Sequence, residues 1–244
     1  MNEQIDGKIT MPLVPAGGDE QTAHMAEKTI RDIVVEDYRT AAVFRSHGLD
    51  FCCGGGAKLQ AAAAKKGLDA DALLAELDAV TAVPTGGEPR IEGWSPALIV
   101  AYIIENHHAW VRSVLPSLTA HAVKVNKVHG EGRPGLAEIE KITTTLAGEL
   151  LAHMEREEKE LFPAIVDGAG DTNVAALIDE LDAEHTEAGD AMRELRRLTD
   201  DFTPPEGACT TWRVLYSELE EFERDLHRHV HLENNILFPK VTAG

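Results

Sequence analysis

The stretch from His153 to Pro163 reads H-M-E-R-E-E-K-E-L-F-P, and the stretch from His229 to Pro239 reads H-V-H-L-E-N-N-I-L-F-P. Both follow the pattern H-x3-E-x3-L-F-P. Positions i and i+4 share one face of an α-helix, so each copy points an imidazole and a carboxylate in one direction. The Leu-Phe pair one turn later would pack on the same face, and we expect each proline to end or bend its helix.

Two facing helices that each offer a histidine and a glutamate predict one half of a metal site with two ions. Neutral imidazole and carboxylate suit borderline metals such as iron, and a carboxylate can bridge two ions about 3.5–4 Å apart. A His-Glu pair at this spacing also occurs as a solvated surface contact. The repeat beside an apolar Leu-Phe pair favours the buried site, because an inward-facing carboxylate without a cation is costly.

The other ligands of such a site must come from the remaining helices. A helix before the repeat carries the adjacent pair His107 and His108, then His121 and His129, and the helix between the two copies carries only His185. Neighbouring residues on a helix point about 100° apart, so only one of His107 and His108 can face the core at a given height.

The chain divides into four parts on the basis of periodicity and of its Pro and Gly content. We expect a flexible tail at 1–25, a small helical domain at 26–82, a linker at 83–93 and a bundle at 94–244. The bundle helices are expected at 95–128, 136–166, 172–198 and 208–235. Short loops between long helices indicate an antiparallel four-helix bundle, so the predicted fold class is all-α.

Composition excludes several classes of function. The chain has 244 residues, of which 43% are hydrophobic, and 42 acidic residues against 23 basic ones give a formal net charge of −19. That charge argues against nucleic acid and anionic membrane surfaces as partners. The longest apolar run, Ala97 to Ile104, is far too short to span a membrane, and no signal peptide is visible. We therefore expect a cytoplasmic protein.

The adjacent cysteines Cys52 and Cys53 are the second feature with chemical potential. Adjacent Cα atoms are about 3.8 Å apart, below the usual range for a disulfide, so this pair could close only with strain. Gly54 to Gly56 would lead into a helix starting near Ala57, whose N-terminus would lower a thiol pKa. Buried structural cysteines are the alternative. We expect Cys209 to be a packing residue.

These phrases together resemble the "repair of iron centres" family, di-iron proteins in which a small domain with a vicinal cysteine pair precedes a hemerythrin-like bundle. The resemblance covers roughly residues 24–242 and is carried by the phrases D-F-C-C-G-G at 50–55, the two repeats, E-H-T-E-A-G at 184–189 and P-P-E-G-A-C-T-T-W at 204–212. It implies two non-haem iron ions, carboxylate-bridged and oxo-bridged when oxidised. The ligands that it implies are His108, His153, Glu157, His185, His229 and Glu233.

The resemblance departs from oxygen-carrying hemerythrin, which uses five histidines. His231 and His227 should point away from the metal site, since each is two residues from His229. One histidine fewer leaves coordination positions for small ligands. Glu149 and Glu184, and less strongly Glu105, are candidates for contacts around the ligands, with ordinary surface charge as the alternative.

The resemblance implies repair of iron–sulfur clusters damaged by nitrosative or oxidative stress, by iron donation or by nitric oxide reduction. Cys52 and Cys53 would pass iron or electrons. The implied partners are damaged iron–sulfur proteins, nitric oxide or another diatomic ligand and an external electron donor, because no flavin or nicotinamide fingerprint is visible. The alternative is a hemerythrin-like oxygen or nitric oxide sensor. The sequence leaves open whether the chain forms a homodimer.

Overall fold

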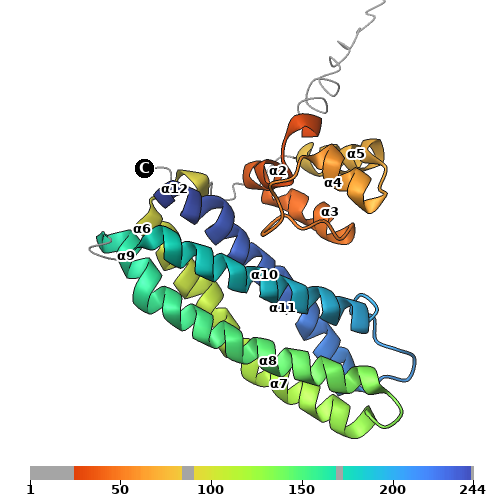
Figure 1. Cartoon of the computed structure of the whole chain (residues 1–244). Helices are drawn as coiled ribbons and strands as arrows, with labels where there is room; N and C mark the ends of the chain where they lie inside the picture. The colour runs from red at the N-terminus through yellow and green to blue at the C-terminus, as the bar shows by residue number, and fades with distance from the viewer. Residues whose placement is uncertain (1–24, 84–90, 169–172, 243–244) are drawn as a thin grey trace, which may run out of the picture.

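The computed structural model describes residues 25–83, 91–168 and 173–242, which form helices joined by loops (Figure 1). Within these ranges the only extended pairing is an isolated antiparallel bridge between Thr29 and Lys58. The predicted all-α class is therefore confirmed. The predicted tail, apart from Met25, and most of the predicted linker lie outside the described residues.

The small N-terminal part is a cluster of short helices. Asp69 caps the last of them by accepting hydrogen bonds from the backbone N–H groups of Asp71 and Ala72, and Gly67 ends the helix before it with a φ of 69°. These local signals were readable from the sequence. The elements are α2 (Ile30–Glu36), the 3-10 turn η1 (Tyr38–Thr40), α3 (Ala41–Ser46), α4 (Leu59–Lys66) and α5 (Ala70–Thr81).

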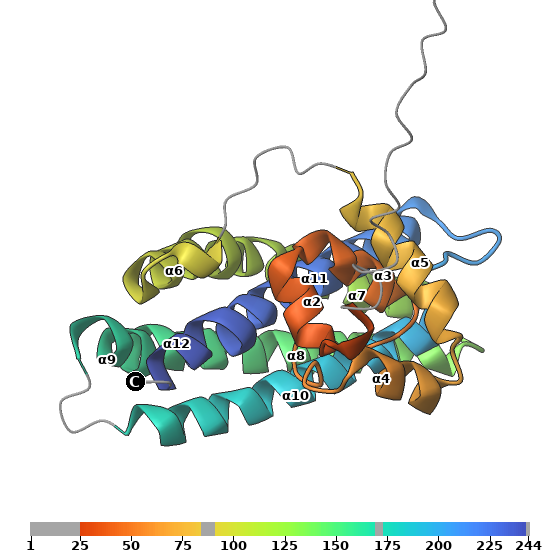
Figure 2. The same ribbon diagram turned by 90° about the horizontal axis from the view of Figure 1, so that it is seen from above.

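The C-terminal part is a bundle of long helical rods (Figures 1 and 2), and the described residues form four of them. In it α8 packs against α7 and α10, and α11 packs against α7. The rods are α6 (Pro96–Tyr102), η3 (Ile103–His108) and α7 (Ala109–His129); α8 (Pro134–Arg156), η4 (Glu157–Leu161) and α9 (Phe162–Asp167); α10 (Val174–Leu198); and α11 (Thr210–Leu232), η5 (Glu233–Leu237) and α12 (Phe238–Thr242). A 3-10 turn, η2 (Ile91–Gly93), precedes the first rod.

Three of the rods contain one π-helical turn each, and these turns lie at the predicted ligands. The turn η3 ends at His108, η4 starts at Glu157, and η5 starts at Glu233. A π-helical turn accommodates an extra residue in an α-helix and rotates the side chains that follow it, and such turns are frequent at functional sites. The sequence pattern does not predict these turns.

Of the expectation that each proline ends or bends its helix, the first part is wrong, because neither proline ends a helix. The second rod continues through Pro163 to Asp167, and the fourth continues through Pro239 to Thr242. Each proline lies in the first turn of the α-helix that follows a π-helical turn, where the missing N–H costs no intrahelical hydrogen bond. The Leu-Phe pairs before the prolines are buried in one hydrophobic cluster, as expected.

The small domain lies across α11 and α10 (Figure 2). One hydrophobic cluster extends from the small domain, including Phe44 and Phe51, into the bundle, including Leu219 and Phe222. The amide of Asn235, in η5, donates a hydrogen bond to the backbone carbonyl of Phe51 over 3.1 Å. The residue next to Cys52 is therefore attached to the turn that also carries Glu233.

Candidate metal centre

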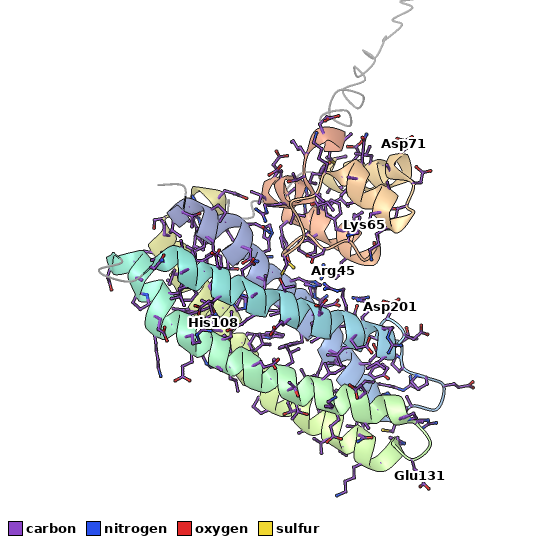
Figure 3. The ribbon with its side chains drawn as sticks, in the orientation of Figure 1. Arg45, Lys65, Asp71, His108, Glu131 and Asp201 are labelled. Carbon is purple, nitrogen blue, oxygen red and sulfur yellow. The ribbon has the colours of Figure 1, made fainter. Side chains whose placement is uncertain are left out.

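Six buried side chains from all four rods converge inside the bundle, where Figure 3 labels His108. They form two groups of possible metal ligands, in each of which one atom per residue lies within 4.8 Å of the others. Both groups contain Glu157 and Glu233. The first group adds His108 and His229, and the second adds His153 and His185. The structure thus brings together the six residues named from the sequence.

Each glutamate spans the two groups with its two carboxylate oxygens. Oε2 of Glu157 lies 3.3 Å from Nε2 of His108, and its Oε1 lies 3.4 Å from Nε2 of His153. Oε1 of Glu233 lies 2.9 Å from Nε2 of His229, and its Oε2 lies 3.3 Å from Nε2 of His185. One oxygen facing each group is the arrangement of a carboxylate that bridges two ions.

Acceptors on neighbouring helices fix the orientation of three of the four imidazoles. Nδ1 of His108 lies 2.7 Å from Glu158, and Nδ1 of His153 lies 2.7 Å from Glu184. Nδ1 of His185 lies 3.0 Å from Oδ1 of Asn234. A ring that donates its Nδ1–H outward presents the lone pair of Nε2 to the interior, which is the form that binds a metal.

The inward nitrogens approach one another in pairs. Nε2 of His108 lies 3.0 Å from Nε2 of His229, and Nε2 of His153 lies 3.0 Å from Nε2 of His185. In the neutral form that binds a metal, His108, His153 and His185 direct Nδ1–H outward and their Nε2 atoms offer lone pairs. Within each pair the nitrogens and the carboxylate oxygens around them therefore converge on one space, which suits a cation between them.

The carboxylates themselves lack the partners that burial demands. Both oxygens of Glu157 and Oε2 of Glu233 are buried without a hydrogen bond to any described residue. A buried carboxylate is costly unless it is paired or coordinates a metal. These orphaned oxygens, together with the nitrogen donors, fit two borderline divalent ions such as iron.

The pKa values of the ligand side chains are shifted because buried carboxylates and imidazoles lie close together. Burial alone would lower the pKa of His153, but the charges of Glu157 and Glu233 and the hydrogen bond to Glu184 outweigh it and raise the pKa to about 9. Burial acts to raise the pKa of Glu233, yet the adjacent imidazoles of His229 and His185 hold it well below its usual value. Both shifts have one cause, the close approach of buried carboxylates and imidazoles.

The structure decides between the adjacent histidines. His107 is buried but belongs to neither ligand group; its Nδ1 lies 2.9 Å from Asp225, and its ring stacks on that of His229 at 5.7 Å. His231 and His227 point away from the centre, as expected. Their rings contact the small domain, at 5.3 Å from Tyr38 and 5.5 Å from Phe51 respectively.

Of the surrounding glutamates proposed from the sequence, only Glu184 contacts a ligand. Its carboxylate also accepts a hydrogen bond from Arg156 over 2.5 Å. Glu149 and Glu105 are exposed, and neither contacts a ligand histidine in the described part of the chain. Glu149 lines a small cavity beside His153.

Two contacts of the ligand histidines are not among the predictions from the sequence, although the repeat itself indicates their positions. Glu158 follows Glu157, and Asn234 follows Glu233, and each supplies the acceptor for a histidine of another rod. The repeat is therefore extended by one polar position after each glutamate. Asp182 holds Asn234 in place by accepting its amide N–H over 2.5 Å, which leaves Oδ1 of Asn234 for His185.

The cysteine pair lies in the loop between α3 and α4. Cys52 is buried, Cys53 is half-buried, and both are free thiols with their sulfurs 3.9 Å apart. The predicted lowering of a thiol pKa by a helix N-terminus is wrong, because α4 starts only at Leu59. Instead the hydrogen bond with Cys53, burial and the nearby Asp50 carboxylate raise the pKa of Cys52 well above its usual value.

The expectation for Cys209 is also wrong. Its side chain is exposed at the start of α11, where Sγ lies 3.2 Å from Nε2 of His129.

Comparison with known proteins agrees with this architecture. The hemerythrin HHE cation binding domain matches residues 100–241, and a domain of unknown function, DUF542, matches residues 26–81. No helix in the described ranges is long and apolar enough to cross a membrane.

Curated relatives match nearly the whole chain. The iron-sulfur cluster repair protein YtfE of Pectobacterium atrosepticum is 40% identical over 218 residues, which cover 89% of this chain and 98% of that protein. The protein of the same name from Yersinia pestis is 41% identical, over 84% of this chain and 92% of its own length. The protein of the same name from an Enterobacter species is 37% identical, over 89% of this chain and 98% of its own length. The chain therefore belongs to the family of these iron-sulfur cluster repair proteins, and its bundle is a hemerythrin HHE domain.

Proposed function

We propose that this chain is a non-haem di-iron protein that repairs iron–sulfur clusters damaged by nitrosative or oxidative stress. One observation carries the metal assignment: two buried groups of four ligands share both of their glutamates. The names of the relatives support repair as the function. We propose the cytoplasm as its compartment and damaged iron–sulfur proteins as its partners.

The proposed ligands are His108 and His229 for one ion, His153 and His185 for the other, and both glutamates as bridges. Two iron ions bound there would supply one-electron chemistry and coordination positions for nitric oxide, or serve as the iron that is donated. The protein's part is to hold the imidazoles by their Nδ1 atoms and to exclude water from the carboxylates, which are fully buried.

The cysteine pair completes the proposal. Cys52 and Cys53 lie in the loop that Asn235 attaches to the bundle, so a thiol site and a metal site are parts of one packed structure. We propose that these thiols pass iron or electrons during repair. The chain carries no flavin or nicotinamide fingerprint, so the electron donor is proposed to be external.

Elemental analysis of protein purified without added metal tests the centre. We expect two irons per chain, and we expect the double variant Glu157→Ala with Glu233→Ala to lose them while its circular dichroism remains helical. Glu149→Ala is the matched control on the same rod and should keep both irons. Stoichiometric iron in the double variant would overturn the assignment.

Recovery of a cluster enzyme inactivated by nitric oxide tests the function. We expect the iron-loaded protein to restore its activity, and the double variant Cys52→Ala with Cys53→Ala to keep its iron but repair more slowly. Unaltered repair would remove the thiols from the mechanism. If the protein binds nitric oxide reversibly but restores no cluster, the sensor alternative holds.

A further inference from the structure

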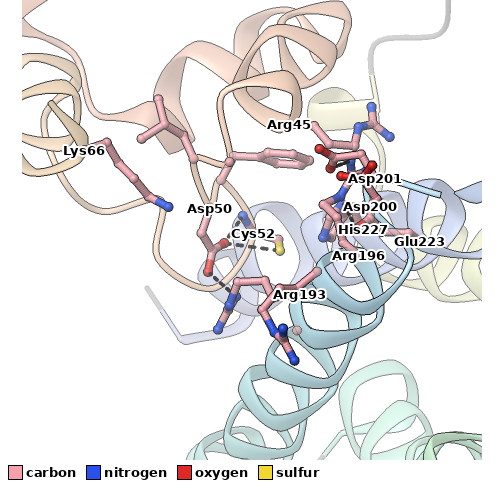
Figure 4. Close-up of a pocket in the computed structure, with 15 residues that line it drawn as sticks. Arg45, Asp50, Cys52, Lys66, Arg193, Arg196, Asp200, Asp201, Glu223 and His227 are labelled. Atoms are coloured by element: carbon pink, nitrogen blue, oxygen red, sulfur yellow. Dashed lines mark hydrogen bonds and ion pairs between the residues drawn. The ribbon is translucent and has the colours of Figure 1, made fainter. Parts of the chain in front are cut away.

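Three side chains outside the bundle centre form another compact group of metal-ligating atoms. Cys52, Cys53 and Asp50 each place one such atom within 4.8 Å of the others. The two sulfurs are 3.9 Å apart, and Oδ1 of Asp50 lies 3.4 Å from Sγ of Cys52. Figure 4 shows the carboxylate of Asp50 directed at the sulfur of Cys52.

These separations fit the edges of a tetrahedral metal site. With metal–sulfur bonds of about 2.3 Å and a metal–oxygen bond of about 2.1 Å, two thiolates lie about 3.8 Å apart and a carboxylate oxygen lies about 3.6 Å from each sulfur. A metal could therefore enter between the three side chains with small movements. Thiolate ligands in such a geometry select zinc or iron among the common divalent ions.

The loop that carries the three residues is held in place before any metal binds. Oδ1 of Asp50 accepts the backbone N–H groups of Cys52 and Cys53, each over 3.0 Å. Gly55 permits the tight return of the chain, because a Cβ there would lie 2.5 Å from the carbonyl oxygen of Phe51. Asn235 fixes the same carbonyl from the bundle. Such preorganisation lowers the cost of binding.

The surroundings supply access and charge. Cys52 and Asp50 line a cavity of about 460 Å³ between the small domain and the bundle (Figure 4). Two thiolates, one carboxylate and a divalent cation leave one negative charge. Arg193 lies 3.7 Å from Oδ2 of Asp50, and Arg45 and Lys66 line the same cavity without forming an ion pair in the described part of the chain. These cations offset the remaining charge.

We propose that Asp50, Cys52 and Cys53 form a second metal site, which holds one thiophilic divalent cation with a fourth position open to a ligand from the cavity. On binding, each thiol releases its proton to solvent as its sulfur–metal bond forms, and no electron is transferred. This cation is ferrous iron in transit between the bundle and a damaged cluster, an identification that rests on the proposed function.

Cobalt(II) is the probe, because thiolate ligation gives it a charge-transfer absorption that nitrogen and oxygen ligands alone do not. The full chain, with its bundle centre loaded with iron and its thiols reduced, is titrated with Co²⁺ without oxygen. We expect one cobalt per chain beyond the iron, together with the charge-transfer band. We expect Cys52→Ser and Cys53→Ser each to bind cobalt more weakly and to show a weaker band, and the double variant Cys52→Ser with Cys53→Ser to lose the band.

Two further variants test the contribution of the Asp50 charge and control for the distant thiol. Asp50→Asn retains an acceptor for the loop N–H groups but loses a charge, so we expect cobalt affinity to fall about tenfold or more with the fold intact. Cys209→Ser removes the exposed distant thiol and should leave the titration unchanged. Iron content and circular dichroism establish that each variant is folded.

Equal cobalt uptake and absorption in Cys52→Ser and in the wild-type protein would overturn the inference. Loss of the band in Cys209→Ser would also overturn it, since the thiolate ligand would then lie elsewhere. The result is separable from the repair assay. A cobalt site without cluster repair would refute the proposed function alone, and repair without a cobalt site would refute this inference alone.

Discussion

The side-chain amide of Asn235 donates one hydrogen bond to the backbone carbonyl of Phe51 over 3.1 Å. It also lies 2.9 Å from Nδ1 of the buried His231. Asn235 follows Glu233 by two residues in the same π-helical turn, while Phe51 directly precedes Cys52. One turn of helix therefore supplies a ligand to the candidate metal centre and an anchor to the thiol loop.

Replacing Asn235 with alanine should loosen the thiol loop without emptying the metal centre. The variant leaves the Phe51 carbonyl and the His231 nitrogen unpaired, so we expect the free energy of unfolding to fall by about 1–3 kcal/mol. We also expect faster alkylation of Cys52 at unchanged iron content. Asn126→Ala, which removes a hydrogen bond to Glu140 elsewhere in the bundle, is the control and should leave Cys52 protected.

Replacing Glu184 and replacing Glu149 should have different effects on metal affinity. Glu184 accepts from Nδ1 of His153, so Glu184→Ala releases the orientation of that ring, and we expect affinity to fall about 10- to 100-fold. Glu149→Ala should leave affinity unchanged, because Glu149 is exposed and contacts no ligand histidine among the described residues. Competition with a chelator measures both values, and equal losses would contradict the structure.

Replacing His108 should lower the iron content, whereas replacing His107 should lower the stability. His108→Ala removes a proposed ligand, and we expect iron content to fall below two per chain. His107→Ala removes a stacked ring and leaves Asp225 without its imidazole, so we expect lower thermal stability at full iron content. Iron analysis and calorimetry on both variants check this. A loss of iron in His107→Ala equal to that in His108→Ala would show that the two roles are not distinct.

The cysteines should differ in reactivity towards iodoacetamide in the metal-free protein. Cys209 is exposed and should react first. Cys52 is buried and its pKa is raised well above its usual value, so little of it is thiolate at pH 8, and we expect at least tenfold slower modification at that pH. Peptide mass spectrometry at several pH values gives the rates. In denaturant the difference should disappear.

Removal of the metal should destabilise the bundle, because the orphaned oxygens of Glu157 and Glu233 then face the inward imidazoles without a cation. A metal at a hundred times its dissociation constant adds about 2.7 kcal/mol to the native state if it does not bind the unfolded chain. We expect a lower melting temperature after chelation and full recovery on adding ferrous iron. An unchanged melting temperature would argue against metal bound between these side chains.

The pattern of residues along the chain is enough to predict the helical class and the kinds of ligand. The i, i+4 spacing in each repeat forces histidine and glutamate onto one face of a helix, whatever the rest of the chain does. Local caps such as Asp69 and Gly67 likewise placed the ends of the short helices. Periodicity does not predict the π-helical turns, because each of them interrupts the regular α-helical repeat that the pattern follows.

Packing between the rods determines which neighbours complete the site. The choice of His108 over His107, and the acceptors Glu158 and Asn234 for rings on other rods, depend on contacts between residues far apart in the chain. The tertiary structure also determines the state of the thiols. The sequence suggested that a helix N-terminus lowers the pKa of Cys52, whereas the hydrogen bond with Cys53, burial and the Asp50 carboxylate raise it. Spacing fixes which way a side chain points along one helix, but only packing fixes what it meets.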